Sequence, residues 1–346
     1  MQFYNIYIIK KLMKNRIQNE ISIENISNTN VHHQSNTLSP ICCILQLESG
    51  IIAIGLYNGN INFYSQTDLD NYYSSLKIDS FPINSIYQIQ DDQLICCSGP
   101  SLYMIFENNL KKLDYNKKEK IIIENVYGKI NKILLLPDES IIIGDNKYIS
   151  LFRKKGKKIS FIKQIKINCP VLDLIIIQSN IVLSAAPQKQ SLIFVDLDKF
   201  AQNYEIKNIK FYNDIKCSNL ISKIKKDLLI VGGCLGIVYL INLKNKQFVA
   251  NITIRYKNEL ITTILKMQNG DLLCGTSMLA KDEITQKEYI CSNLVQYRYN
   301  NNVFKEIYRK SNAHNDVITK ICEVVNHRGI TEFGSVSLDS TFKVWN

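Results

Sequence analysis

The sequence ends with SVSLDSTFKVWN, from Ser335 to Asn346, and this stretch decides the fold. Two short apolar runs lie on either side of the polar pair Asp339-Ser340, which predicts two strands joined by a tight turn. The second strand coincides with the end of the sequence. A strand without a neighbour has a row of unpaired backbone groups along its edge, so we expect another segment to pair with it.

The rest of the chain repeats the same kind of unit. Helical periodicity is weak, and short apolar runs alternate with Gly, Asn, Asp and Pro, which is typical of an all-β protein. At seven positions an apolar anchor residue is followed three residues later by a second apolar residue, and successive anchors lie 40 to 57 residues apart. The anchors are Ile41, Ile83, Ile130, Val171, Ile221, Ile261 and Ile318.

Each anchor starts a unit whose strands and turns come in the same order. A polar turn follows it, then a strand that ends near a small residue, a tight turn, a third strand and a more variable fourth strand. Four strands in about 40 to 45 residues make one blade of a β-propeller. The sequence therefore predicts an all-β, seven-bladed β-propeller with blades starting near residues 41, 83, 130, 171, 221, 261 and 318.

The prolines agree with this division. Proline cannot donate to a strand ladder, so it should fall at strand starts or in turns. Three prolines come immediately before an anchor, and the other three fall in predicted turns. They are Pro40, Pro82 and Pro170, and Pro100, Pro137 and Pro187.

The last unit, residues 313–346, resembles a repeat of the WD40 family. His314 stands four residues before the anchor Ile318, where that family has its histidine. Asp339 lies in the turn between the second and third strands, and Trp345 closes the third strand. The resemblance implies a rigid disc that brings partner proteins together without catalysis.

The resemblance also implies a structural site. In WD40 repeats the histidine, the aspartate, a serine or threonine and the tryptophan form a buried hydrogen-bonded tetrad. Here the members would be His314, Asp339 and Trp345, with either Ser335 or Ser337 as the hydroxyl. The other six units lack the full set, since the chain has a single Trp; Tyr64, Phe152 and Ile241 stand at its position in units 1, 3 and 5.

The seventh unit lacks a fourth strand, and the first anchor comes only at residue 41. Propellers of this family commonly close with a strand from the N-terminal segment. NEISIENIS, from Asn19 to Ser27, alternates apolar and polar residues as an outer strand should, and the competing segment is Phe3 to Lys10. We therefore expect the propeller to span residues 19–346, with residues 1–18 as an extension that could be disordered and either Met1 or Met13 as the start.

Composition limits the function only broadly. The net charge of +11 favours acidic partners, or reflects a codon bias towards Lys. The ten cysteines include two adjacent pairs and no CxxC, which predicts reduced thiols and a cytoplasmic location, with the nucleus or a cilium as alternatives. No segment is long and apolar enough to be transmembrane.

No pattern in the sequence indicates catalysis. The four histidines have no partners at metal-ligand spacing, and neither a phosphate-binding loop nor GxSxG occurs. We therefore expect no enzymatic activity, no cofactor and no metal. The predicted function is a protein–protein interaction scaffold within a multiprotein complex.

Two basic segments support an alternative function. Both fall between the third and fourth strands, in units 2 and 3, so they should lie on one face of the disc. They could bind an acidic ligand, either RNA, an acidic protein tail or an anionic lipid. Their basic residues are Lys111, Lys112, Lys117, Lys118, Lys120, Arg153, Lys154, Lys155, Lys157 and Lys158.

Two apolar residues in turns and one insertion are candidates for binding partner proteins. Tyr57 and Leu338 lie in turns between second and third strands, on the rim with which WD40 domains commonly bind peptides. Either could instead pack against a neighbouring blade. Unit 6 has an insertion around residues 276–289 on the same face, and long loops on rigid scaffolds are often functional.

Overall fold

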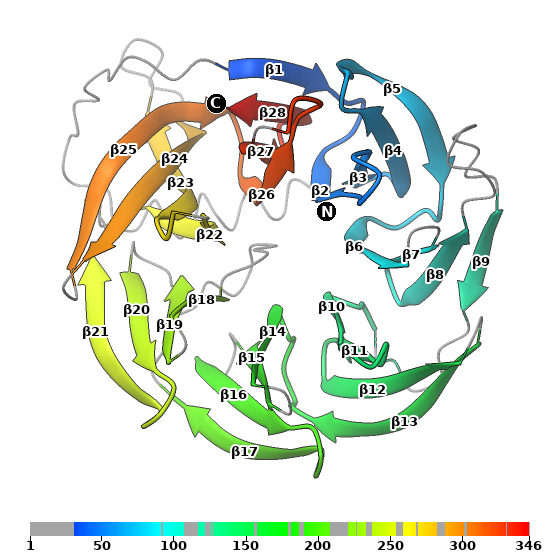
Figure 1. Ribbon diagram of the computed structural model, residues 1–346, viewed down its shortest axis with the longest axis vertical. Helices are drawn as coiled ribbons and strands as arrows, with labels where there is room; N and C mark the ends of the chain where they lie inside the picture. The colour runs from blue at the N-terminus through cyan, green and yellow to red at the C-terminus, as the bar shows by residue number, and fades with distance from the viewer. Residues whose placement is uncertain are drawn as a thin grey trace.

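The chain forms seven four-stranded antiparallel sheets arranged as a ring (Figure 1). The computed structural model describes residues 31–346, except for 91–92, 107–116, 122–125, 127, 156–157, 179–180, 187–189, 208–220, 226, 233–236, 254–258, 268, 282–287, 301–302, 330 and 346. Six of the sheets use four strands that are consecutive in the chain. The seven-bladed β-propeller is therefore confirmed.

The first four blades take up the first half of the chain. Blade 1 has β2 (Ile41–Gln46), β3 (Ile52–Leu56), β4 (Asn60–Ser65) and β5 (Asp68–Lys77). Blade 2 has β6 (Ile83–Gln90), β7 (Gln93–Ser98), β8 (Ser101–Phe106) and β9 (Lys117–Ile121). Blade 3 has β10 (Lys132–Leu135), β11 (Ile141–Gly144), β12 (Tyr148–Lys155) and β13 (Lys158–Lys166). Blade 4 has β14 (Asp173–Gln178), β15 (Ile181–Ala186), β16 (Ser191–Asp196) and β17 (Ala201–Ile206).

Blades 5 to 7 complete the ring. Blade 5 has β18 (Ile221–Lys225), β19 (Leu228–Gly232), β20 (Ile237–Asn242) and β21 (Gln247–Thr253). Blade 6 has β22 (Leu260–Lys266), β23 (Leu272–Lys281), β24 (Glu288–Asn300) and β25 (Val303–His314). Blade 7 has β26 (Ile318–Val325), β27 (Thr331–Ser337), β28 (Thr341–Trp345) and, as its outer strand, β1 (Val31–Asn36).

The inner strands begin within two residues of the predicted anchors. Small residues in the second strand of one blade leave room for the anchor of the next blade to pack against it. A Cβ added to Gly55 in β3 would lie 2.7 Å from Cγ2 of Ile83, the anchor of the next blade. A Cβ on Gly144 in β11 would lie 2.4 Å from Cγ1 of Val171. A glycine at these positions therefore allows the anchor of one blade to pack directly against the sheet before it.

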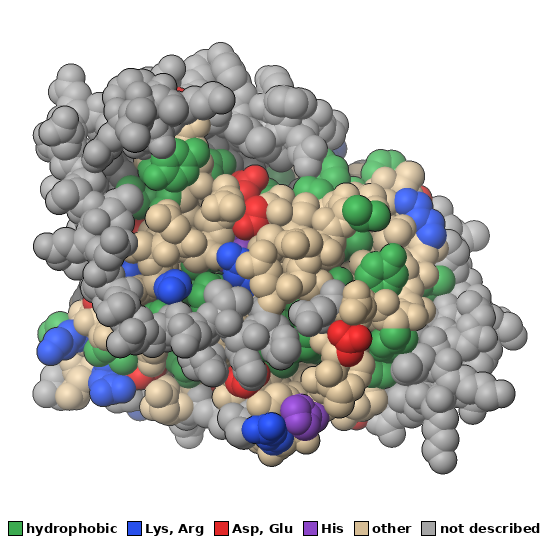
Figure 2. All heavy atoms as spheres, turned by 90° about the horizontal axis from the view of Figure 1, so that it is seen from above, with side chains coloured by type: hydrophobic (Ala, Val, Ile, Leu, Met, Phe, Trp, Pro, Cys, Tyr) green, Lys and Arg blue, Asp and Glu red, His purple; other side chains and the backbone are tan. Residues whose placement is uncertain are grey.

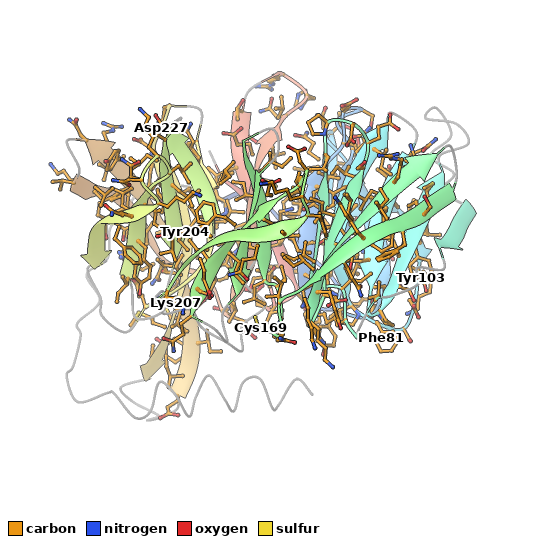
Figure 3. The ribbon with its side chains drawn as sticks, turned by 90° about the horizontal axis from the view of Figure 1, so that it is seen from below. Phe81, Tyr103, Cys169, Tyr204, Lys207 and Asp227 are labelled. Carbon is orange, nitrogen blue, oxygen red and sulfur yellow. The ribbon has the colours of Figure 1, made fainter. Side chains whose placement is uncertain are left out.

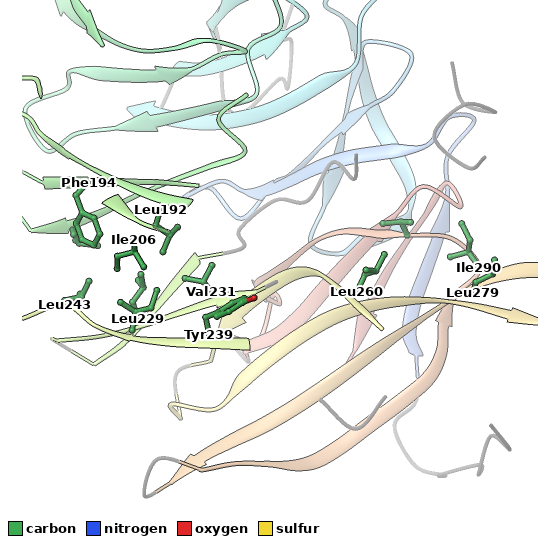
Figure 4. Packing of buried hydrophobic residues seen from close by; sticks show 13 residues of the cluster. Leu192, Phe194, Ile206, Leu229, Val231, Tyr239, Leu243, Leu260, Leu279 and Ile290 are labelled. Atoms are coloured by element: carbon green, nitrogen blue, oxygen red, sulfur yellow. The ribbon is translucent and has the colours of Figure 1, made fainter. Parts of the chain in front are cut away.

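The apolar core is divided among the interfaces between blades. One cluster, for example, joins blades 1 and 2 and includes Phe63 and Ile86, and another joins blades 7 and 1 and includes Ile41 and Phe342. Figure 4 shows a cluster that extends from blade 4 through blade 5 to blade 6 and includes Phe194, Leu229 and Leu260. Each blade is therefore stabilised mainly by its two neighbours, as in other repeat architectures.

The N-terminal part of the described chain closes the ring, but not with the segment predicted. Strand β1 pairs antiparallel with β28, with Gln34 opposite Lys343 and Asn36 opposite Thr341. The predicted closing strand, residues 19–27, and its alternative, residues 3–10, are therefore both wrong, since residues 31–36 provide the outer strand. Residues 1–30, and with them the predicted boundary at residue 19, lie outside the described residues.

The physical reason for this error is the polarity of the closing strand. VHHQSN reads as a linker because it lacks apolar alternation. An outer strand is held chiefly through backbone pairing, so polar side chains are compatible with it. Side-chain contacts add to the closure, because Ser35 is buried and its hydroxyl lies 3.4 Å from Tyr64 Oη of blade 1.

The two faces of the disc carry different connections. One face carries the links between blades and the turns between second and third strands, and is here called the linker face. The other carries the remaining turns and is called the turn face. Figure 3 shows Phe81 and Cys169 near the linker face and Asp227 near the turn face. The predicted insertion of blade 6 extends β23 and β24 into a hairpin that projects from the linker face (Figure 3).

Candidate functional site

Blade 7 contains a buried chain of hydrogen bonds. The Nε1–H of Trp345 donates to Ser335 Oγ at 2.8 Å, and Ser335 Oγ lies 2.7 Å from His314 Nε2. On its other side the His314 ring approaches Asp339, with Nδ1 and Oδ2 3.1 Å apart. One arrangement of protons satisfies all three contacts: Nδ1–H of the histidine donates to Asp339, and Nε2 accepts from the serine hydroxyl.

The electrostatics fit a neutral histidine beside an ionised aspartate. Burial lowers the pKa of His314 more than the neighbouring carboxylate raises it. Burial also raises the pKa of Asp339, but hydrogen bonds from His314 and Thr341 outweigh it and hold that pKa well below its usual range. The network therefore has one fixed negative charge at the turn and a neutral ring inside the blade.

Ser337 has a separate role. Its hydroxyl donates to the main-chain oxygen of Asp316 at 3.0 Å and accepts from the main-chain N–H of Asp339 at 3.1 Å. It therefore fixes the turn that carries Asp339, while Ser335 is the hydroxyl that joins the histidine to the tryptophan. Both serine side chains are fully buried, so neither offers a nucleophile to a substrate.

Blade 6 joins its strands with a different set of residues. Glu259, immediately before β22, is fully buried and accepts hydrogen bonds from Asn293 Nδ2 at 2.6 Å and from Thr276 Oγ1 at 3.2 Å. Arg309 of β25 pairs with the same carboxylate, with Nη1 2.6 Å from Oε1, and also contacts Glu306. Burial lowers the pKa of Arg309, but these bonds outweigh it and keep the guanidinium charged.

This ion pair was missed by the sequence analysis. Its members have no local motif, because Glu259 and Arg309 are 50 residues apart in the sequence. Only the fold brings them together. A buried charged pair of this kind connects the second, third and fourth strands of the blade and has no exposed group for chemistry.

The two predicted partner-binding residues are only partly exposed. Leu338 packs against the apolar cluster that includes Leu279 and Ile290 of the blade 6 hairpin, and its N–H donates to Val317 O at 3.0 Å. The main-chain N–H of Tyr57 donates to Pro40 O at 2.8 Å. Thus neither residue stands free on the linker face.

Two residues that the sequence analysis did not single out are more exposed there. Leu38 is 100% exposed and Phe81 is 50% exposed. Both lie in links between blades, Leu38 before blade 1 and Phe81 before blade 2. Isolated apolar residues in polar loops give no periodic signal, which is why sequence reasoning did not find them.

Of the predicted basic patch, the structure describes the side chains of Arg153 and Lys154. Arg153 is exposed, whereas the side chain of Lys154 is 4% exposed, with its Nζ 3.6 Å from Glu139 Oε2. Lys154 was therefore wrongly assigned to a solvent-facing patch: consecutive residues of a strand point to opposite faces, so a run of charges cannot all face solvent.

The other members of that patch give no test of it. The outer strand β9 contains Lys117, Lys118 and Lys120, while Lys155 lies in β12 and Lys158 in β13. The side chains of these five lysines lie outside the described part of the structure. The described residues do not include Lys111, Lys112 or Lys157. On the rim around β1, the described basic, acidic and hydrophobic side chains are interspersed (Figure 2). The acidic-ligand hypothesis stays a prediction.

The described residues include neither a group of three or more His, Cys, Asp or Glu side chains placed to hold a metal ion nor a helix long and apolar enough to span a membrane.

Comparison with known proteins agrees with the fold. No protein-family model and no curated protein sequence matches the chain. Among solved structures, a chain of the "Crystal Structure of Mitotic Checkpoint Complex" superposes with a TM-score of 0.70 at 11% sequence identity, covering 96% of this chain and 98% of that one. Altogether 1319 chains of solved structures match. At such low identity, and with so many matches, the likeness shows the architecture and leaves the function to be argued from the surface.

Proposed function

We propose that this chain is a non-catalytic scaffold of the WD40 type, on which partner proteins assemble in a complex. The hydrogen bonds among His314, Ser335, Asp339 and Trp345 support the WD40 assignment. The similar solved chain belongs to a multiprotein complex, which supports protein partners. Propellers present several loop-bearing faces on a rigid frame, which suits assembly better than a single cleft would.

The observation that carries the proposal is a pair of exposed apolar residues on fixed main chain. Beside Leu38, the N–H of Thr37 donates to Ser340 O at 2.8 Å, and Ser39 Oγ accepts from the N–H of Asn58 at 3.1 Å. These hydrogen bonds fix the backbone beside Leu38, but its fully exposed side chain contributes nothing to the free energy of folding.

Phe81 is held in a similar way. Its main-chain oxygen accepts a hydrogen bond from Ser98 Oγ at 2.7 Å, and its ring lies against Gly99. Because an ordered aromatic side chain loses little entropy on binding, it is well suited to anchor a partner. Leu38 and Phe81 flank blade 1 on the linker face and define the proposed partner-binding surface.

A non-catalytic role is consistent with the buried polar groups. Burial raises the pKa of the Cys97 thiol to about 11 and raises that of Cys43 further, so neither thiol is an activated nucleophile. Thiols among the described cysteines include Cys43, Cys97 and Cys274, which supports the cytoplasmic location that forms part of the proposal, with nucleus and cilium as alternatives.

The test compares two variants by affinity purification and mass spectrometry. The double variant Leu38→Asp, Phe81→Asp should lose a defined set of co-purified proteins while keeping its thermal stability. Val303→Asp is the matched control, since Val303 is 63% exposed on the turn face. If both variants keep the same proteins as the wild type, or lose the same ones, the proposed surface is wrong.

A further inference from the structure

The outer strands of the blades differ in the regularity of their pairing. In six of the seven blades the register between the third strand and the outer strand shifts at a β-bulge or similar irregularity. In blade 3, for example, Phe161 and Lys163 of β13 lie opposite consecutive residues of β12, and Ile162 is the extra residue between them. A bulge twists the strand and disrupts the row of backbone groups on its open edge, which hinders pairing with another chain.

Blade 2 is the exception. Strands β8 and β9 pair without a shift, from Leu102 opposite Ile121 to Phe106 opposite Lys117. Among the described residues β9 is the last strand of its sheet, and it lies on the outside of the ring (Figure 1). In a regular antiparallel strand, alternate residues direct both N–H and C=O away from the paired neighbour. The outward edge of β9 is therefore a template on which a further strand can form.

The sequence of β9 determines which strand can pair with it. KKEKI, from Lys117 to Ile121, contains three lysines, one glutamate and no proline. Two copies of this strand would bring like net charges together, which destabilises a sheet. A strand with Asp or Glu at the opposed positions would instead be stabilised by opposite charges. The edge of β9 therefore disfavours self-association and favours an acidic strand.

The other basic outer strand does not combine these two properties. KISFIKQIK of β13 contains three lysines and no acidic residue, but its bulge interrupts the edge. In β9, Lys118 and Lys120 are two residues apart, so they occupy the same face of a regular strand. An acidic strand that alternates in the same way would place a carboxylate opposite each of them.

We propose that β9 binds an acidic, extended segment of a partner protein, which adds to blade 2 as a fifth strand. Main-chain hydrogen bonds to the outward groups of β9 would supply the affinity, and carboxylates opposite Lys118 and Lys120 would supply the selectivity. This surface lies on the rim of the ring and is distinct from the linker face that carries Leu38 and Phe81. It gives the scaffold a second place to hold a partner.

The experiment is fluorescence anisotropy of the full chain with a labelled peptide of about eight residues that alternates Glu and Thr, a length typical of a strand. One control peptide has Lys in place of Glu. A second keeps the Glu-Thr sequence but has an N-methyl group on every residue, which removes the main-chain donors and keeps the charge. The Glu-Thr peptide should bind, and neither control should. Hydrogen exchange should show added protection of amides in β9 when the peptide is bound.

Two double variants of the protein test the selectivity. Lys118→Glu, Lys120→Glu should weaken binding of the Glu-Thr peptide by about tenfold or more, because two attractive cross-strand pairs become repulsive. Lys166→Glu, Lys207→Glu is the matched control. It makes the same change of net charge at exposed lysines of blades 3 and 4, whose outer strands are bulged, and should leave the affinity unchanged.

Strand addition is excluded if the Glu-Thr peptide does not bind the wild type. It is also excluded if the N-methylated peptide binds equally well, since charge alone would then explain binding, or if the two double variants weaken binding equally. Tighter binding of a uridine oligonucleotide than of the peptide would assign the lysines to RNA and overturn the proposal. If Lys118→Glu, Lys120→Glu does not fold, the N-methylated peptide and the exchange of β9 amides decide the question with the wild type.

Discussion

Blade 7 joins its strands through hydrogen bonds centred on the neutral His314, whereas its neighbour blade 6 uses a buried ion pair between Glu259 and Arg309. In both blades a buried acceptor near the start of the inner strand contacts a hydroxyl on the second strand, Ser335 in blade 7 and Thr276 in blade 6. The comparison shows that two neighbouring blades make a buried polar link at this place with different chemistry.

The two blades also differ in how they are built. Blade 6 uses four consecutive strands, while blade 7 takes three strands from one end of the chain and β1 from near the other. Blade 6 can therefore form from a local segment, and blade 7 forms only when the ring closes. A small deletion should therefore reduce stability most where β1 pairs with β28 to close blade 7.

The largest expected effect is the loss of β1. A protein lacking residues 1–36 should unfold or aggregate, because β28 would keep an open edge and the contact between Ser35 and Tyr64 of blade 1 would be lost. A protein lacking residues 1–30 keeps β1 and is the matched control. Size-exclusion chromatography and thermal melting measure the difference; equal behaviour of the two truncated proteins would contradict closure by β1.

Breaking the ion pair of blade 6 should have the next largest effect. Arg309→Met leaves Glu259 buried without its partner, which should cost about 3–5 kcal/mol of unfolding free energy. The double variant Arg309→Met, Glu259→Met removes both charges and should be more stable than the single variant. Urea denaturation measures both midpoints.

The control for that prediction is a pair in the same blade whose arginine, unlike Arg309, is exposed. Arg298 pairs with Asp271 at 3.0 Å, but its side chain is 59% exposed. Arg298→Met should therefore shift the urea midpoint far less than Arg309→Met does. Equal shifts would show that burial is not what distinguishes the two arginines.

The repeat could be predicted from the sequence because its signal is local and recurs. The contact between Gly55 and the anchor Ile83, for example, appears in sequence as a small residue and then an apolar one at a regular distance. His314 and Trp345 could be placed for the same reason, since their spacing within one unit is fixed. Such patterns reflect backbone geometry that every blade must satisfy.

What could not be predicted depends on contacts between distant segments. The polar closing strand β1 is defined by its pairing with β28, which lies at the other end of the described chain. The position of Lys154 beside Glu139 depends on which side of β12 faces the blade. Charge runs and polar stretches carry no information on that choice, so burial of a lysine in a basic segment has to be seen in three dimensions.

Within blade 7, the two serines should differ in a smaller but measurable way. Ser335→Ala leaves the Trp345 N–H and the His314 ring nitrogen buried without a partner, which should cost about 1–3 kcal/mol. Ser337→Ala removes a bond to the main chain of the turn and should cost about 0.5–1.5 kcal/mol. Equilibrium urea titrations of both variants test the order, and a larger loss for Ser337→Ala would reverse the roles assigned here.

The smallest expected effect is a pH dependence of stability that arises in blade 7. Burial lowers the pKa of His314 in the folded state, so the unfolded chain takes up a proton more readily as the pH falls below about 6.5. Stability should therefore decrease between about pH 7 and pH 5, and further below about pH 4, where the unfolded chain protonates Asp339 and the folded chain resists it. The single tryptophan, Trp345, lies in the same network, so its fluorescence during urea unfolding reports on blade 7. His314→Gln should flatten the dependence between pH 7 and pH 5, and a variant that keeps the wild-type slope would show that His314 is not its source.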